Sequence, residues 1–361
     1  MKKNKVRIIQ ILPTLSYGDG VSNDTLAIDR ILRKNGFRTK IYAENIDKRI
    51  PKETVQHIAR LPRLKERDII LYHLSTGSRL NDLLPGFKGR KIIIYHNITP
   101  DKYFADYHDF SATLCREGRK SLSKLCTVPE YCLADSPYNR EELLENGYSC
   151  KIDVMPIIIP FEDYEKTPSG KVMSGYENDG YTNIIFTGRI APNKKQEDII
   201  EVFAYYQKYY NPKSRLFLVG SYHNMEKYLR RLQGYVQQLG VKHVVFTGHI
   251  PFDEILAYYH LADLFLCMSE HEGFCIPLVE AMYFQIPVIA RAGTGVTGTL
   301  GDGGILLEGK NPLETAGLIH YVLEHPRVRE ALTESGSRRL EDFATERMEQ
   351  LFMNYLNAFM A

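Results

Sequence analysis

The sequence has no apolar run near the roughly 20 residues that a membrane-spanning helix requires. Residues 1–15 begin with lysines and then turn apolar, but Arg7, Gln10 and Pro13 interrupt the run. A secretory signal needs about 7 to 15 uninterrupted apolar residues and a small-residue cleavage site, so a first buried strand is the better interpretation. We therefore expect a cytoplasmic protein that is at most peripheral to the inner face of the cytoplasmic membrane.

Cysteines are few, and their spacing is not that of a metal site. The sequence contains no CxxC pair and no pattern of Cys and His typical of zinc ligands, so neither a structural metal nor a redox motif is indicated. We expect reduced, buried thiols at Cys115, Cys126, Cys132, Cys150, Cys267 and Cys275.

Short internal repeats and low-complexity segments are also absent from the sequence. Hydrophobic residues make up 44% and charged residues 25%, which are values of folded globular proteins, and 24 Tyr and 16 Phe argue against disorder. A chain of 361 residues exceeds what one hydrophobic core usually supports. We therefore expect two domains of about 150 to 200 residues each.

Short apolar runs rich in β-branched residues alternate with longer amphipathic stretches, which is typical of βαβ units around a parallel sheet. The pattern occurs twice, and it predicts an α/β protein. The strands predicted first are Val6–Leu12, Thr39–Ala43, Ile69–His73, Ile92–His96 and Cys132–Ser136. Those predicted after the interruption are Asn183–Thr187, Arg215–Val219, Val244–Thr247, Leu264–Met268, Pro287–Ala290 and Gly304–Leu307.

The periodic pattern also gives the domain boundaries. Residues 161–181 contain glycines, a proline and charges but no apolar period, so we interpret them as a linker between domains 1–160 and 182–343. Helical spacing is clear for Asn23–Asn35, which Gly36 ends, and for a last helix in residues 344–361. The apolar stripe of that last helix must pack on another part of the protein.

Charge is distributed unevenly along the chain. Residues 1–160 hold 27 Lys and Arg against 19 Asp and Glu, whereas the remainder holds 19 against 25. A basic half suggests an anionic partner such as membrane phospholipid or nucleic acid, and a solvated charge excess without a partner is the open alternative. The segment Cys115–Cys126, with four basic residues, is a candidate contact helix, or else an ordinary solvated face.

The segment Ser269–Met282 places two carboxylates beside a helix start. Glu272 lies in the loop after a predicted buried strand, and Glu280 lies in the first turns of the next helix, where Pro277 suits the first turn. The unpaired N–H groups and the dipole at such a helix start form an anion site that suits a diphosphate. Taken alone, Glu272 is also explained as an exposed loop acid, and Glu280 as an acid that stabilises the helix dipole.

Three further loops follow predicted strands. Thr187–Lys195 carries Gly188, Arg189 and Lys194 at a strand end, where open α/β sheets bind ligands. Its cations suit a phosphate group, and the alternative is a basic loop that is exposed to solvent. Tyr17–Ser22 contains Gly18 and Gly20, which permit close backbone approach or a plain left-handed turn. His96 stands at the end of its strand, either at a binding edge or as a simple strand cap.

These motifs resemble those of the GT-B glycosyltransferases of family 4. The resemblance spans about residues 5 to 360 and is better in the C-terminal half. The family signature has two Glu separated by seven residues, as Glu272 and Glu280 are, with Gly and Phe after the first and Pro before the second. The resemblance implies two Rossmann-like, doubly wound domains that face each other across a cleft, with the last helix crossing back to the N-terminal domain.

The resemblance also implies roles for individual residues. Glu272 and His96 would act at the donor sugar, Glu280 would hold the ribose, and the loop at Gly18 and Gly20 would reach the diphosphate. Arg189 and Lys194, after Gly188, would clamp the diphosphate; the family usually has Gly where this chain has Lys195. Further donor contacts are implied for Gly220, Ile250, Gly273, Phe274, Cys275 and Leu278, and Asp135-Ser136 resembles another position near the cleft.

The activity that the resemblance implies is retaining transfer of a hexose, of mannose or glucose type, from a GDP- or UDP-sugar to a glycan or lipid-linked acceptor in surface polysaccharide synthesis. The sequence contains no two Asp separated by one residue, the pair with which metal-dependent GT-A enzymes hold a cation, so no metal or other cofactor is expected. The partners that the resemblance implies are a nucleotide-sugar donor and the acceptor, and no nucleic acid partner is expected. Many relatives carry Glu where this chain has Gly298. A phosphorylase, a sugar-nucleotide epimerase and a non-catalytic nucleotide-sugar-binding subunit remain alternatives.

Overall fold

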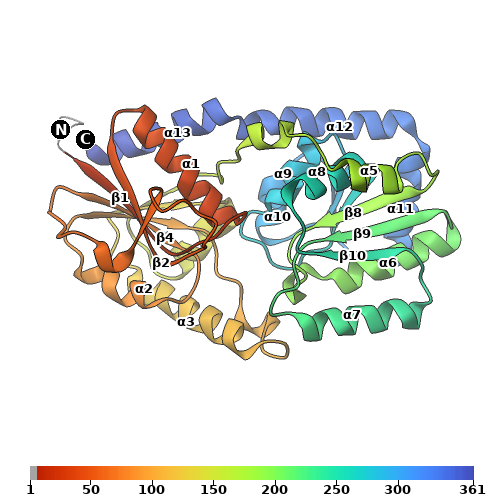
Figure 1. Cartoon of the computed structure of the whole chain (residues 1–361), viewed down its shortest axis with the longest axis horizontal. Helices are drawn as coiled ribbons and strands as arrows, with labels where there is room; N and C mark the ends of the chain where they lie inside the picture. Colours follow the sequence, from red (N-terminus) through yellow and green to blue (C-terminus); the bar gives the residue numbers. More distant parts are fainter. Residues whose placement is uncertain (1–5) are drawn as a thin grey trace. The chain divides into compact units, whose positions relative to one another are not determined.

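The computed structural model describes residues 6–361, and residues 1–5 of the first predicted domain lie outside the described residues. The chain forms two units, each with its own parallel sheet (Figure 1). The first unit comprises Met1–Asp101, Phe110–Pro160 and Phe343–Ala361, and the second comprises Lys102–Asp109 and Phe161–Asp342.

The first unit is built on a seven-stranded sheet with the order β3-β2-β1-β4-β5-β6-β7. All neighbouring strands run parallel. The chain leaves β1 to one side of the sheet and returns with β4 on the other, so the β1/β4 boundary is the switch point where such sheets bind ligands. The strands are β1 Arg7–Leu15, β2 Arg38–Ile46, β3 Val55–His57, β4 Ile69–Leu74, β5 Arg90–Tyr95, β6 Tyr131–Ala134 and β7 Lys151–Val154.

Helices cover this sheet because their apolar faces bury against its Ile-rich and Leu-rich strands. The last helix, α13, belongs to this unit: Met348, Phe352, Met353 and Leu356 share one buried cluster with Ile8 and Ile28. Figure 1 shows α13 beside α1, where Lys34 pairs with Glu349 at 2.7 Å. The helices are α1 Gly20–Lys34, α2 Arg79–Leu83, α3 Asp109–Leu125, α4 Pro137–Glu145 and α13 Thr345–Met360, with 3-10 turns at Ile58–Arg60 and Leu84–Gly86. A further 3-10 turn, Asp101–Tyr103, stands where the chain passes from the first unit to the second.

The second unit has a six-stranded parallel sheet with the order β10-β9-β8-β11-β12-β13, so its switch point lies between β8 and β11. Its strands are β8 Thr182–Thr187, β9 Ser214–Val219, β10 Val244–Gly248, β11 Leu264–Cys267, β12 Val288–Arg291 and β13 Ile305–Leu307. Its helices are α5 Gly170–Tyr176, α6 Gln196–Tyr209, α7 Glu226–Leu239, α8 Phe252–His260, α9 Ile276–Tyr283, α10 Thr294–Leu300, α11 Pro312–Glu324 and α12 Pro326–Leu340, with 3-10 turns at Phe161–Glu165, Pro192–Lys194 and Glu341–Phe343.

Two segments differ from the sequence-based boundaries. Residues 161–181, interpreted as a linker, contain a 3-10 turn and α5, and they belong to the second unit because Tyr164 and Val172 are buried there. Residues 102–109, placed in the first domain, also join the second unit. Tyr107 packs on Tyr228 with ring centroids 5.2 Å apart, and Lys227 Nζ donates to the carbonyl of Asp106 at 2.5 Å.

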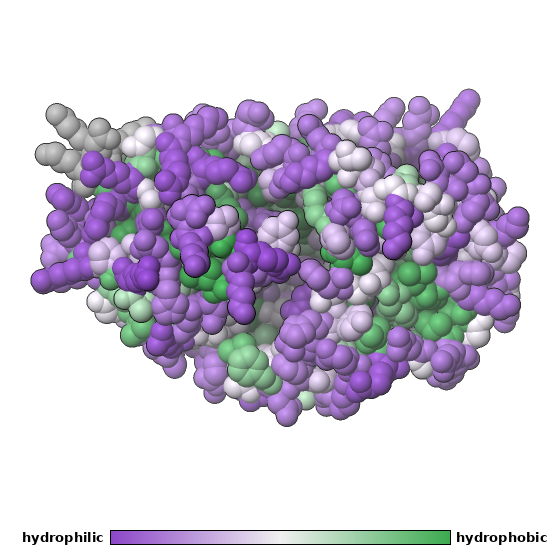
Figure 2. Space-filling model, viewed as in Figure 1, coloured by the Kyte–Doolittle hydropathy of each residue, from purple (hydrophilic) through white to green (hydrophobic). Residues whose placement is uncertain are grey.

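The surface is mainly polar on the face drawn in Figure 2, with smaller hydrophobic areas between the charged side chains. Within residues 6–361, none of the helices is both long enough and apolar enough to cross a membrane.

Candidate functional site

Two loops meet at the switch point of the second sheet. One follows β8 and holds Gly188, Arg189 and Lys194, and the other follows β11 and holds Glu272. Asn193, which is buried, ties them together: its Nδ2 donates to the carbonyl of His271 at 2.9 Å, and its own carbonyl accepts from the N–H of Glu270 at 2.8 Å. The two motifs predicted from the sequence are therefore parts of one site.

Lys194 and Glu272 form a buried ion pair in this site, with Nζ 2.5 Å from Oε2 and side chains 21% and 8% exposed. Burial alone would lower the pKa of Lys194, but the attraction of Glu272 outweighs it and the pKa is raised. Lys194 is therefore a cation. The neighbouring Lys195 lies near Glu270 instead, with Nζ and Oε2 3.4 Å apart.

The loop that carries Glu272 is held from its other side by the start of α10. The N–H of Glu272 donates to Thr294 Oγ1 at 3.0 Å, and the N–H of Gly295 donates to the Glu272 carbonyl at 2.9 Å. A Cβ on Gly295 would lie 2.1 Å from the carbonyl oxygen of Gly273, so only glycine allows this approach. These contacts fix the Glu272 backbone from both sides.

Helix α9 begins directly after this loop. Cys275 precedes it with φ of 78°, and Pro277 stands in the first turn, where a missing N–H loses no helical hydrogen bond. The N–H groups of a first helical turn have no partner within the helix, and the dipole there favours an anion. Phe274, Cys275 and Leu278 are buried, so a ligand at this end would meet backbone atoms rather than their side chains.

Glu280 lies further along α9 between two tyrosines. Its Oε1 accepts from Tyr164 at 2.9 Å, and its Oε2 accepts from Tyr259 at 2.6 Å. Tyr259 also contacts Thr187 Oγ1 at the end of β8. Burial raises the pKa of Glu280, although both tyrosine hydrogen bonds act in the opposite direction.

The remaining predicted residues of the second unit lie at the same edge of the sheet or near it. Arg189 is exposed, and its carbonyl accepts from Gln196 at 3.0 Å. A Cβ on Gly220 would lie 2.0 Å from the Gly188 carbonyl, so the ends of β8 and β9 need glycine to approach this closely. Ile250 is half-buried in the loop after β10. Gly298 stands where many relatives carry Glu. Its backbone carbonyl accepts a hydrogen bond from Arg339 Nη2 at 2.6 Å.

Gly18, Gly20 and His96 lie in the first unit. Gly18 has φ of 74°, and α1 begins at Gly20, where Asp19 caps the helix by accepting from the Ser22 N–H at 3.2 Å. This loop follows β1 at the switch point of the first sheet. His96 follows β5, with its side chain 1% exposed.

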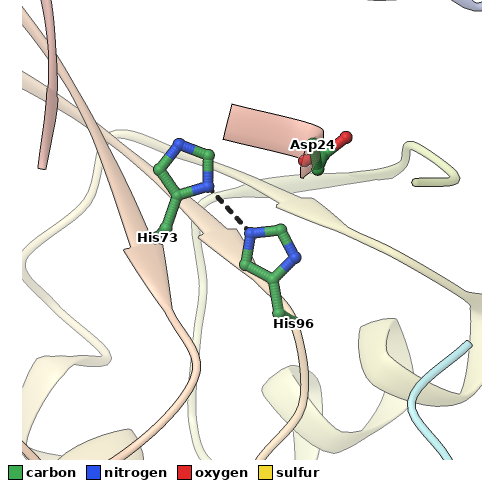
Figure 3. Close-up of side chains that lie close together, drawn as sticks. All are labelled: Asp24, His73 and His96. Carbon is green, nitrogen blue, oxygen red and sulfur yellow. Dashed lines mark hydrogen bonds between the residues drawn. The ribbon is translucent and has the colours of Figure 1, made fainter. Parts of the chain in front are cut away.

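His96 is held by a buried polar cluster. Its Nε2 lies 2.8 Å from His73 Nδ1, and its Nδ1 lies 2.9 Å from Asp135 Oδ2. Burial alone would lower the pKa of His96, but Asp135 and Asp24 outweigh it and the pKa is raised. Burial lowers the pKa of His73, and the charge of His96 adds to this effect. Figure 3 shows the two rings with Asp24 beside them.

Asp24, His73 and His96 offer one potential metal-ligand atom each, all within 4.8 Å of one another. The two ring nitrogens are, however, 2.8 Å apart and share a hydrogen bond. Two nitrogens on one tetrahedral zinc would be about 3.3 Å apart, given Zn–N distances of about 2.0–2.1 Å. The geometry described here is therefore that of a hydrogen-bonded network.

Sequence reasoning missed several residues of both sites. The sequence pattern predicts only a strand at Gln10 and His73, only a helix at Asp24 and a linker at Tyr164. A signal for Gln10 and His73 was present, because a polar residue inside an otherwise apolar strand must find a partner, and Gln10 stands between Ile9 and Ile11. Asn193 stood within the cationic motif, but nothing in its sequence indicated that it joins two loops.

Part of the second unit is similar in sequence to a known protein family. Residues 174–339 match the family model described as Glycosyl transferases group 1. A GDP-mannose-dependent alpha-(1-6)-phosphatidylinositol monomannoside mannosyltransferase from Mycolicibacterium smegmatis is 29% identical over 242 residues, covering 63% of this chain and 62% of that protein. A D-inositol 3-phosphate glycosyltransferase from Jonesia denitrificans is 26% identical over 197 residues, covering 53% of this chain and 46% of that protein.

Among solved structures, HepE from Anabaena in complex with UDP-glucose superposes with a TM-score of 0.74 and 16% identity, over 98% of this chain and 99% of that chain. The predicted fold class is thus confirmed: two Rossmann-like units of the GT-B fold. Residues 174–339 are thus similar to glycosyl transferases of group 1, and the relatives that the chain resembles are glycosyltransferases. The chain spans about half the length of the curated relatives it matches, from 46% to 62% for these two.

Proposed function

We propose that the chain is a retaining glycosyltransferase that moves a hexose, of mannose or glucose type, from UDP or GDP to an acceptor hydroxyl. The observation that carries the proposal is the Lys194–Glu272 pair beside the start of α9, at the switch point of a Rossmann-like sheet. A helix start favours phosphate, a lysine neutralises it, and a carboxylate accepts from sugar hydroxyls. The group 1 match over the same residues supports this assignment.

In the proposed reaction, the bond between the sugar C1 and the diphosphate oxygen breaks while a bond between C1 and the acceptor oxygen forms on the same face. The acceptor proton passes to the departing diphosphate. Arg189, Lys194 and the α9 N–H groups stabilise the negative charge that builds on the diphosphate. Glu272 holds the sugar and Glu280 the ribose, and no protein carboxylate has to act as nucleophile.

The acceptor in this proposal is a glycan or a lipid-linked glycan of surface polysaccharide synthesis, met at the inner face of the cytoplasmic membrane. The excess of basic residues in 1–160 and the phosphatidylinositol monomannoside named for the Mycolicibacterium relative support an anionic lipid acceptor. Since protein cations take the part of a metal, we propose that transfer requires none.

The test combines binding with product analysis. We expect UDP or GDP and one of their hexose conjugates to raise the melting temperature, and ADP to leave it unchanged, because ligand binding to the folded state stabilises it. Incubation with that donor, with and without EDTA, should release the same amount of nucleotide diphosphate, and NMR of the product should show the donor's anomeric configuration. No stabilisation by any nucleotide sugar, or an inverted product, would contradict the proposal.

A further inference from the structure

A chain of hydrogen bonds crosses four neighbouring strands of the first sheet. Gln10 on β1, His73 on β4, His96 after β5 and Asp135 after β6 are consecutive members, in the order in which their strands lie in the sheet. All four residues are buried, with exposed fractions from 0% to 9%. Because these side chains are buried, each must donate to or accept from its neighbours, which limits where the protons can lie.

The order of the protons starts at Gln10. Its Nε2 donates to the carbonyl of Thr25 at 3.1 Å, and a carbonyl can only accept. The other amide atom, Oε1, therefore faces His73 Nε2 at 3.0 Å and accepts from it. His73 must carry its proton on Nε2.

His73 is uncharged because burial and the neighbouring His96 lower its pKa. A neutral imidazole has one N–H, which Gln10 has already engaged, so His73 Nδ1 is an acceptor. The partner of His73 Nδ1 at 2.8 Å is His96 Nε2, which must therefore donate (Figure 3).

His96 then has a proton on Nε2 and a carboxylate 2.9 Å from Nδ1. Burial raises the pKa of the Asp135 carboxyl, but Asp135 and Asp24 raise the pKa of His96 as well, and imidazole is ordinarily the more basic of the two groups. We therefore assign the proton between Nδ1 and Asp135 to the ring. We propose that His96 is held as an imidazolium by Gln10 and His73, which act as positioning residues, and that it serves as a fixed cation and not as a proton acceptor.

The groups around His96 are compatible with this charge. Asp135 faces it from the end of β6, His73 from β4, and Asp24 and Asp19 from α1 and its cap. Asp24 Oδ1 also accepts from the N–H of Ile158 at 2.9 Å. One cation thus faces three carboxyl groups, and a positive ring is attracted by each ionised one.

The charge assignment rests on the hydrogen-bond geometry together with the neutral state of His73 and the basicity of imidazole, whereas its meaning for catalysis rests on the proposed function. An imidazolium has no lone pair, so His96 cannot remove the proton of the acceptor hydroxyl. The proposed reaction, in which the departing diphosphate takes that proton, requires no base at His96.

The direct test is NMR of the histidine ring nitrogens in the whole ¹⁵N-histidine-labelled protein, titrated from about pH 5 to pH 9 around the ordinary imidazole pKa. Signals are assigned by their loss in His73→Asn and His96→Gln. We expect two protonated nitrogens on His96 at neutral pH and a proton only on Nε2 of His73 throughout. A neutral His96 at pH 7, a proton on Nδ1 of His73, or ring shifts on adding Zn²⁺ that EDTA reverses would overturn the proposal.

Variants test the positioning residues. Gln10→Met removes the acceptor for His73 Nε2, so His73 can turn its N–H towards His96, whose apparent pKa should fall by about one unit or more. His73→Asn keeps an acceptor for His96 and should leave it charged, whereas His73→Phe should not. Gln207→Met, a matched change of a hydrogen-bonded glutamine in the second unit, should leave His96 unaffected. An unchanged His96 in a folded Gln10→Met protein would refute the role of Gln10.

The proposed role of His96 in catalysis is tested by the pH dependence of transferase activity. Relative to the unmodified protein, Gln10→Met should lose transferase activity at alkaline pH and regain it as the pH falls and His96 takes up its proton again. A structural defect would instead lower activity equally at every pH. If the unmodified protein transfers no sugar, the proposed function fails, while the NMR experiment still decides the charge of His96.

Discussion

At the scale of single residues, two lysines of the candidate site in the second unit form ion pairs with glutamates. Lys194 faces Glu272, and Lys195 faces Glu270, but the two pairs differ in environment: the Glu272 side chain is 8% exposed and that of Glu270 is 31% exposed. Breaking a buried pair costs stability because the remaining charge is left without a partner, whereas breaking a partly exposed pair costs less because water solvates the remaining charge. The inner pair is therefore the one for which we expect a functional role.

This difference predicts the effect of neutralising each carboxylate. Glu272→Gln should lower the rate of sugar transfer by about 10²–10³-fold, which is typical of losing one preorganised electrostatic contact. Glu270→Gln, a matched change two residues away in the same loop, should leave the rate within a few-fold of the unmodified protein. Steady-state kinetics with the stabilising donor measures both, and equal losses in the two variants would contradict the assignment.

Asp24 predicts a pH dependence of stability. Burial raises its pKa to about 7, although the charge of His96 acts in the opposite direction. Since the folded state holds this proton more tightly, the contribution is present below the unfolded pKa of about 3.9 and is lost as the pH rises through about 7. Relative to Asp24→Asn, the unmodified protein should therefore lose up to about 4 kcal/mol of unfolding free energy between about pH 4 and pH 8.

Urea unfolding of both proteins across this pH range measures the difference. Asp82→Asn is the control, because the side chain of Asp82 is 72% exposed and the substitution should add no comparable pH dependence. A difference between Asp24→Asn and the unmodified protein that stays constant with pH would show that Asp24 remains ionised in the folded state.

At the scale of elements, the last helix completes the core of the first sheet. Phe352 is 1% exposed in a cluster that includes Ile8 of β1 and Ile28 of α1, which are separated from it by more than half of the chain. Packing of this kind removes a large apolar surface from water. Helix α13 is thus part of the core of the first unit.

Shortening the Phe352 side chain should lower the stability of the first unit. Phe352→Ala should lower the unfolding free energy of the first unit by about 3–5 kcal/mol, the usual loss for a buried Phe. Phe110→Ala at the start of α3 is the control, since Phe110 is 65% exposed and a surface change of this kind alters stability by about 0.5 kcal/mol or less. Chemical denaturation followed by circular dichroism measures both, and similar values for the two variants would contradict the packing role of α13.

At the scale of the whole molecule, the two units have separate sheets and separate contact networks. Each unit also has its own set of polar side chains at the switch point of its sheet: the His96 cluster in the first unit and the Lys194–Glu272 site in the second. Two such units can respond separately to ligands and to mutations, because interactions inside one core do not extend into the other.

Calorimetry should resolve this independence. We expect the nucleoside diphosphate that binds best to raise the unfolding temperature of one transition, that of the second unit, because the site proposed for it lies at the start of α9. Phe352→Ala should lower the temperature of the other transition. If the nucleotide and the substitution act on the same single transition, the two units unfold as one cooperative body.

Much of the architecture was predictable from periodicity. The eleven strands predicted from apolar runs all occur, because a strand of a parallel sheet is buried on both faces and is therefore mostly apolar. The short strands β3 and β7 were not predicted, since Val55–His57 and Lys151–Val154 mix polar and apolar residues at the two edges of the sheet. Residues 102–109 and 161–181 have no period, so only their tertiary contacts assign them to the second unit.

The sequence by itself determined the two α/β units and where the two candidate phosphate motifs lie relative to strands and helices, since strand burial, glycine positions and helix starts are local properties of the chain. Only the tertiary structure decided which side chains meet. Lys194 and Glu272 are 78 residues apart, and the links from Gln10 through His73 and His96 to Asp135 span 63, 23 and 39 residues. Proton positions depend on such contacts, because a neighbour's donor or acceptor sets them and sequence spacing does not.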